Sequence, residues 1–157
     1  MPVKSDPRDK ARKLRMIMRT DLLSLAAVVL AVLAPAAHAQ VPAPPGAQVY
    51  FIEPADGATV KSPVTVKFGL KGIGVAPALV EWPNTGHHHL LVDREPVPAG
   101  TVIPNDATAL HFGGGQTEAQ IPLTPGTHTL VLELGDHQHI PHRPPIASPK
   151  ITITVTP

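Results

Sequence analysis

The sequence contains no cysteine, and its three methionines all lie within the first eighteen residues. The rest of the chain therefore has neither disulfides nor sulfur ligands, and any metal ion must be held by imidazole and carboxylate groups. Aromatic residues make up only 3% of the chain, whereas proline occurs twenty times. Because proline breaks helix interiors, this composition argues against long helices.

The apolar run Leu22–Ala36 has fifteen residues, fewer than the roughly 20 that a transmembrane helix needs. It follows seven basic residues and precedes Ala37-His38-Ala39, which is the order of a secretory signal. We expect residues 1–39 to be a signal peptide, with Met1, Met16 or Met18 as its start. The protein would then be periplasmic or secreted, without a stable membrane anchor.

Removal of residues 1–39 changes the charge of the chain. Seven of the thirteen basic residues but only three of the twelve acidic residues lie in this segment. Six basic and nine acidic residues remain, a formal net charge of −3. Nothing in this balance indicates nucleic-acid binding.

Residues 40–47 are rich in proline and alanine and predict a stiff linker, and residues 48–157 are long enough for one domain. Within the domain, short segments of alternating or β-branched residues are separated by turn signals. The predicted strands are 48–52, 64–70, 87–93, 107–112, 117–123, 127–134 and 150–155. About seven short strands predict an all-β fold, an antiparallel sandwich of the immunoglobulin-like type.

Histidine is the abundant chemical group of the domain. Eight histidines follow residue 39, and seven of them fall in three clusters, within 86–93, 110–118 and 135–142. Neutral imidazole binds Zn²⁺ or Cu²⁺ near neutral pH. The candidate metal ligands are His87, His89, His111, His137, His139 and His142.

In an immunoglobulin-type sandwich, the loops before the third strand, after the fourth and after the sixth lie at one end of the domain. The three histidine clusters occupy these places, so we expect them to converge. His87 and His89 share one face of their strand, because side chains alternate. His88, Asp93, Glu118 and Asp136 are candidates for groups that support or orient the ligands.

Two histidines share a face with apolar residues, which favours a packing role. His128 alternates with Leu130 and Leu132, and we expect it to be a hydrogen-bonded core or edge residue. His88 alternates in the same way with Leu90 and Val92, so a ligand role is less favoured for it than for its neighbours.

Three long motifs carry a resemblance to a known family: T-G-H-H-H-L-L-V-D over 85–93, H-F-G-G-G-Q-T-E over 111–118, and L-G-D-H-Q-H-I-P-H-R-P-P over 134–145. The chain resembles a family of small exported bacterial proteins that is catalogued as a domain of unknown function. The resemblance implies export and a shared histidine-rich site, and it implies no reaction.

The leading hypothesis is an exported protein that stores, buffers or delivers Cu²⁺ or Zn²⁺, with the ion and another periplasmic protein as partners. No catalytic residue is assigned. One alternative is a metal-dependent enzyme, in which three imidazoles and an open position activate water. Another is a recognition module without metal, in which Trp82 could stack on a sugar ring or pack against the loop prolines.

Overall fold

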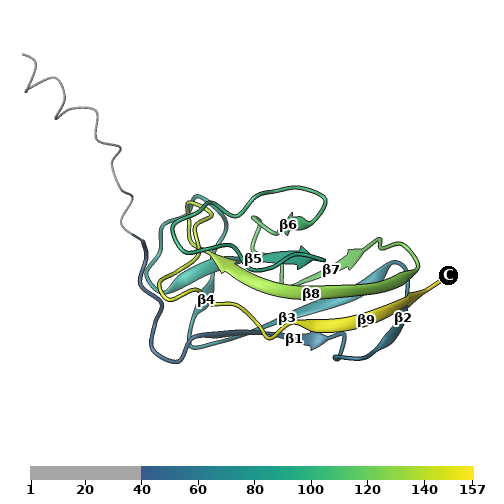
Figure 1. The fold of residues 1–157 in the computed structure, drawn as a ribbon. Coiled ribbons are helices and arrows are strands. Elements are labelled where there is room, and N and C mark those ends of the chain that lie inside the picture. Colours follow the sequence, from purple (N-terminus) through teal and green to yellow (C-terminus); the bar gives the residue numbers. More distant parts are fainter. Residues whose placement is uncertain (1–39) are drawn as a thin grey trace, which may run out of the picture. The chain divides into compact units, whose positions relative to one another are not determined.

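The computed structural model describes residues 40–157, which form β-strands and no helix. The prediction of an all-β fold is thus confirmed. In chain order the strands are β1 (Gln48–Glu53), β2 (Thr59–Lys61), β3 (Val64–Lys71), β4 (Gly74–Val75), β5 (Thr85–Val92), β6 (Ala109–His111), β7 (Glu118–Ile121), β8 (Gly126–Gly135) and β9 (Ile151–Thr156) (Figure 1). All seven predicted strands are present, and β2 and β4 are two further short ones.

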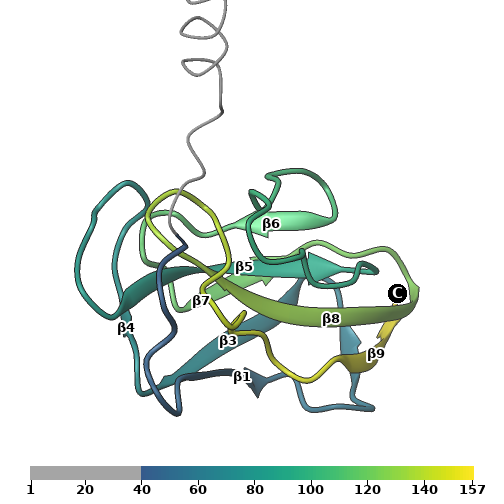
Figure 2. The ribbon, with the colours of Figure 1, turned by 60° about the vertical axis from the view of Figure 1, so that its left-hand side comes forward.

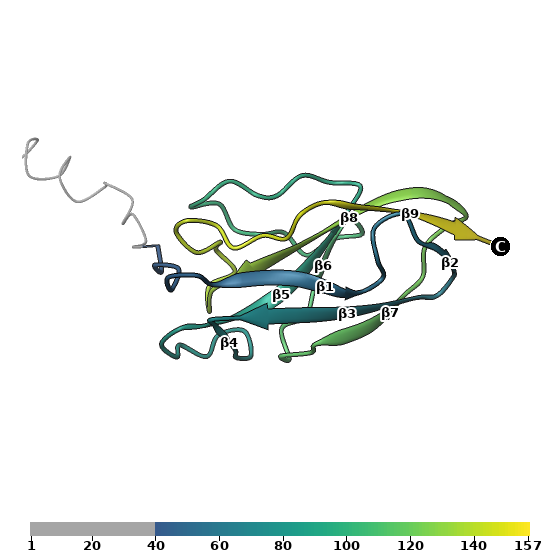
Figure 3. The same cartoon turned by 90° about the horizontal axis from the view of Figure 1, so that it is seen from below.

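The strands form two sheets. The smaller sheet has the order β1-β3-β7 and is antiparallel, as the view from below shows (Figure 3). The larger sheet has the order β2-β9-β8-β5-β4, and β6 pairs with β5. Two short pairings in it, β2 with β9 and β4 with β5, are parallel.

Alternation of buried and exposed residues explains why these segments become strands. Val64, Val66 and Phe68 of β3 are buried, and Ile151, Ile153 and Val155 of β9 face them across the same core cluster. β-Branched and aromatic residues suit such a half-buried pleated surface. The two sheets thus bury one apolar core between them, which is a sandwich-like arrangement.

The immunoglobulin type stays a prediction. The first, second and fifth predicted strands (β1, β3, β7) lie in one sheet, and the third, sixth and seventh (β5, β8, β9) in the other. An immunoglobulin constant-type domain divides its strands in this way. However, the fourth predicted strand, β6, pairs with β5 rather than with β7.

Strand β5 is buried on both faces, which is the feature that positions the histidines. Leu90 and Val92 face the core between the sheets. Leu91 faces the other way, into a second apolar cluster with Val97, Ile103, Ala109 and Val131. The segments that precede β6 and follow β8 lie over this outer face of the larger sheet (Figure 2).

The predicted signal peptide, residues 1–39, lies outside the described residues. In the predicted linker, Val41 and Ala43 are hydrogen bonded to the backbone of Arg143, each at 2.9 Å, so this part of 40–47 lies against the segment after β8. Within residues 40–157 no helix has the length and apolarity to cross a membrane.

Candidate metal centre

His87 and His89 project from the outer face of β5. Both side chains are fully buried, and their ring centroids are 4.8 Å apart. Residues two apart on a strand share a face, so the sequence spacing alone brings these two rings together. The outer face is covered by loops, and the site therefore lies under the loops rather than among exposed loop ends.

His111 reaches the same place from β6. It is the Cα partner of His89 in the antiparallel β5–β6 pair, and its ring centroid lies 5.1 Å from that of His89 and 5.0 Å from that of His87. A Cβ atom at Gly113 would lie only 2.3 Å from the His111 ring. The glycine that follows β6 therefore makes room for the imidazole.

His139 comes from the loop after β8. Its ring centroid is 4.7 Å from that of His111, 4.9 Å from that of His87 and 6.1 Å from that of His89. The residue has a positive φ of 66°. Its carbonyl accepts a hydrogen bond of 2.7 Å from the Ile103 N–H, which ties this loop to the segment before β6.

Asp136 shapes that loop from within. Its Oδ1 accepts hydrogen bonds from the backbone N–H groups of Gln138 at 2.8 Å and Ile140 at 3.0 Å. Gly135 lies next to it, and a Cβ atom there would come within 2.8 Å of the His89 ring and 3.4 Å of the His139 Cα. The Gly-Asp pair therefore lets the loop fold closely over His89, and Asp136 supports the site through the backbone.

The three rings on β5 and β6 could hold a metal ion. His87, His89 and His111 each offer a ring nitrogen, and these nitrogens all lie within 4.8 Å of one another. Nitrogens bound to one ion at 2.0–2.1 Å are at most about 4.2 Å apart. A small closure of the three rings therefore suffices, and the His139 ring borders them without falling within this distance of all three.

Five ring nitrogens of His87, His89 and His111 lack protein partners. Both nitrogens of His87, both of His89 and Nε2 of His111 are buried and have no hydrogen-bond partner among the described residues. Buried polar atoms are nearly always paired, and unpaired ones call for an explanation such as an ion. The chemistry of the donors and their lack of partners together fit a metal ion.

The rings are held in the neutral form that binds metals. Burial, followed by the neighbouring His139 and His111, lowers the pKa of His87 to about 3. Burial, followed by His87 and His111, lowers the pKa of His89 to about 3. The pKa of His111 is lowered as well, first by burial and then by His139. Their lone pairs are therefore available at neutral pH without competition from protons.

Glu133 on β8 is a feature of the site that the sequence analysis missed. It is the Cα partner of His89, its side chain is fully buried, and burial raises its pKa. Its Oε2 accepts a hydrogen bond of 2.9 Å from the Val97 N–H, while Oε1 has no partner among the described residues. The available signal was one acidic residue within the apolar run Leu130–Leu134.

Two predicted ligands lie away from the cluster. His142 is fully buried near Gly86, where its Cε1 would lie 2.9 Å from an added Cβ, and its Nε2–H donates to the Thr85 carbonyl at 3.2 Å. Gly86 and His87 are neighbours on β5, so His142 lies beside the opposite face of the strand. His137, on the loop with His139, lines a surface pocket instead.

Three of the supporting candidates also lie elsewhere. His88 packs in the core against Phe68, with ring centroids 4.9 Å apart, and its Nδ1–H donates to the Gln116 carbonyl at 3.2 Å. Asp93 is hydrogen bonded to His128 at 2.7 Å, beyond the end of β5. Glu118 is exposed on β7, in the other sheet.

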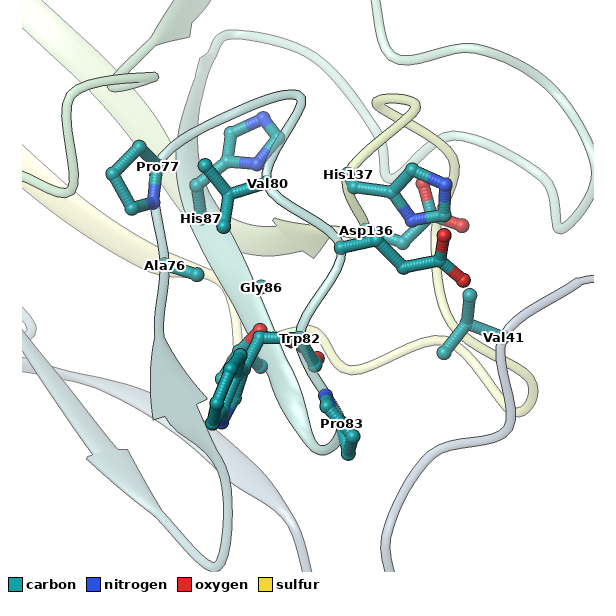
Figure 4. Close-up of a pocket in the computed structure, with 12 residues that line it drawn as sticks. Val41, Ala76, Pro77, Val80, Trp82, Pro83, Gly86, His87, Asp136 and His137 are labelled. Carbon is teal, nitrogen blue, oxygen red and sulfur yellow. Dashed lines mark hydrogen bonds between the residues drawn. The ribbon is translucent and has the colours of Figure 1, made fainter.

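A pocket of about 350 Å³ adjoins the cluster (Figure 4). Its lining includes Pro77, Trp82, His87, Asp136 and His137. Trp82 is 69% exposed, so its indole is available to a ligand in this pocket. Because both ring nitrogens of His87 are buried, the pocket meets this residue without exposing its donor atoms.

Comparison with known proteins confirms the resemblance noted from the motifs. Residues 66–156 match the family described as "Domain of unknown function (DUF4399)". This range includes His87, His89, His111 and His139. No curated protein and no solved structure matches the chain. The match covers more than half of the sequence, and the chain therefore belongs to the DUF4399 family.

Proposed function

We propose that this is an exported protein that binds one Cu²⁺ or Zn²⁺ ion for storage, buffering or delivery. The observation that carries the proposal is the set of buried nitrogens of His87, His89 and His111, which lie within 4.8 Å of one another and have no protein partner among the described residues. Export is supported by the basic and then apolar pattern of residues 1–39.

The donor set favours a borderline divalent ion. Imidazole suits Zn²⁺ and Cu²⁺, whereas Cu⁺ prefers thiolate and thioether ligands, which the chain lacks after residue 18. Three rings with His139 as a fourth would complete the tetrahedral coordination of a closed zinc site. Burial of the donors favours holding an ion over activating water for an outside substrate.

Titration of the untagged protein with Zn²⁺ and with Cu²⁺ tests this function. We expect one ion per chain with a dissociation constant below the micromolar range, and loss of that binding in a His87→Ala, His89→Ala double variant. Binding no tighter than millimolar, or equal binding by the double variant, would exclude the proposal. His137→Ala is the matched control, because it removes a histidine of the same loop as His139 that lies outside the cluster.

A second candidate function is recognition of a small ligand in the pocket beside Trp82, favoured by the exposed indole and the pocket volume of about 350 Å³. The variant Trp82→Ala distinguishes this function from metal binding. This variant should retain metal affinity, and it should lose ligand binding only if the pocket is the functional site.

A further inference from the structure

Glu133 stands apart from the other acidic groups of the domain because it is fully buried on the same face as the histidine cluster. In the antiparallel pairing of β5 with β8 it stands directly opposite His89. Side chains at paired positions have Cβ atoms about 4.5–5.5 Å apart, so the side chains of Glu133 and His89 are neighbours on this face.

Only one of the two carboxylate oxygens of Glu133 has a hydrogen-bond partner among the described residues. Oε2 accepts the Val97 N–H, whereas Oε1 is buried without a partner among the described residues. Both ring nitrogens of His89 are likewise buried without a hydrogen-bond partner among the described residues. No hydrogen bond joins the two groups in the structure, but unpaired groups of complementary chemistry stand at paired positions of neighbouring strands, since a ring N–H donates and a carboxylate oxygen accepts.

Glu133 is not one of the ligands themselves. The ligand atoms that fall within 4.8 Å of one another are those of His87, His89 and His111. A ligating histidine uses one nitrogen for the ion, and its other N–H is almost always given to a carboxylate, a carbonyl or water. Glu133 is the buried carboxylate that the fold places next to such a ring.

The charge of a bound ion also favours a role for Glu133 beside the metal ligands. Four neutral imidazoles leave the two positive charges of a bound divalent ion uncompensated in a buried site, where unpaired charge is costly. The cation whose charge acts on Glu133 is Arg94, which lies partly exposed and is paired with Asp106 at 3.1 Å. The buried carboxylate of Glu133 is therefore available to balance the charge of the ion.

We propose that Glu133 is the anionic partner of the metal site: its Oε1 accepts the N–H of His89 that faces away from the ion, and its charge selects a divalent over a monovalent cation. This inference rests on the proposed function. Coulomb energy scales with the charge of the ion, so removing the carboxylate weakens binding of a divalent ion more than that of a monovalent ion.

The test compares Glu133→Gln with the unchanged protein, both untagged, using Zn²⁺ and Ag⁺ as probes. Loss of a group that orients a metal ligand costs roughly 10–100-fold in affinity, which we expect for Zn²⁺. If Zn²⁺ binding falls by about 100-fold, Ag⁺ binding should fall by only about 10-fold, because half the charge is involved. Glu118→Gln, an exposed change in the other sheet, should alter neither affinity.

Three further results decide the interpretation. Without added metal, Glu133→Gln should melt no lower than the unchanged protein, because the variant removes a buried carboxylate. Glu133→Asp keeps the charge and should preserve the ratio of Zn²⁺ to Ag⁺ affinity. This second variant provides the test if the glutamine variant does not fold. Equal losses for both ions, or no loss for either, would overturn the role of Glu133 while leaving the metal site intact. Failure of the unchanged protein to bind Zn²⁺ or Cu²⁺ would instead overturn the proposed function itself.

Discussion

His89 on β5 and His111 on β6 are partners in an antiparallel pair, with ring centroids 5.1 Å apart and ring planes inclined by 29°. Backbone pairing therefore fixes the distance between the two imidazoles before any ion is bound. His87 on β5 lies beside His89, and His139 on the loop after β8 lies beside His111. A site prepared in this way loses little entropy on binding, since few side chains remain to be ordered.

Replacing a clustered histidine by an apolar residue should separate metal binding from stability. In His89→Leu, a buried ring with two unpaired nitrogens is replaced by a side chain that needs no hydrogen bonds. We expect thermal unfolding without metal at the same or a higher temperature, together with a loss of zinc affinity greater than 100-fold. A lower melting temperature without metal would show that the rings serve the fold rather than an ion.

The two neighbouring glycines after β6 should respond differently to alanine. At Gly113 an added Cβ would lie 2.3 Å from the His111 ring, so Gly113→Ala displaces that ring and should cost about 1–3 kcal/mol of stability along with metal affinity. At Gly114 the nearest atoms belong to the flexible Gln116 side chain, at 3.1 Å. Gly114→Ala should therefore retain affinity. Equal effects of the two substitutions in calorimetric titration would argue against the placement of His111.

Acid should destabilise the protein through the histidine cluster. The pKa values of His87 and His89 are lowered from 6.5 to about 3 in the folded chain, chiefly by burial. The unfolded chain therefore binds more protons between these values, so the two rings cost no stability above pH 6.5 and destabilise the fold increasingly as the pH falls toward 3. Urea unfolding at pH 7 and pH 4.5 should show a smaller pH effect in a His87→Leu, His89→Leu variant. An unchanged pH effect would contradict this assignment.

Asp93 should influence stability without influencing metal affinity. Its carboxylate accepts hydrogen bonds from Thr129 N–H at 2.8 Å and from the His128 ring at 2.7 Å, which raises the pKa of His128. Because that pKa is raised, the pair stabilises the fold below pH 6.5, and this contribution is lost as the pH rises through the folded value. Asp93→Asn should cost about 1 kcal/mol at pH 6, a figure reduced for partial exposure. Reduced zinc affinity in this variant would instead indicate that Asp93 supports or orients the metal ligands, as the sequence predicted.

Metal should stabilise the folded protein by mass action. An ion at 100 times its dissociation constant adds about 2.7 kcal/mol, and a chelator should reverse the change. Differential scanning calorimetry with and without Zn²⁺ measures this shift. The His87→Ala, His89→Ala variant should show none, and a shift of equal size in that variant would place the ion elsewhere.

The strand pattern was predictable because alternation of apolar residues directly reflects burial. All seven predicted strands are present, and only the very short β2 and β4 were missed, since two or three residues carry no periodicity. The meeting of the histidines of β5, β6 and the loop after β8 was also expected. The prediction placed this meeting at one end of the domain, and it did not include the cover over the site, which segments 93–108 and 136–142 form by folding over the outer face of the larger sheet.

Burial of that outer face explains the other differences. A strand covered on both faces gives no sign of which side holds a site, so the position of Glu133 opposite His89 could not be predicted from the sequence. His142 and His88 belong to the core side of β5, where carbonyl acceptors satisfy one nitrogen of each ring. Such assignments depend on loop paths and strand partners, which local sequence patterns do not contain.

Anomalous X-ray scattering from a crystal of the untagged protein grown with Zn²⁺ tests the central claim most directly. We expect a single strong peak bounded by the rings of His87, His89 and His111, with nitrogens at about 2.0–2.1 Å. A peak bound by His137 or His142 in its place, or no peak at a zinc concentration well above that of the protein, would contradict the account.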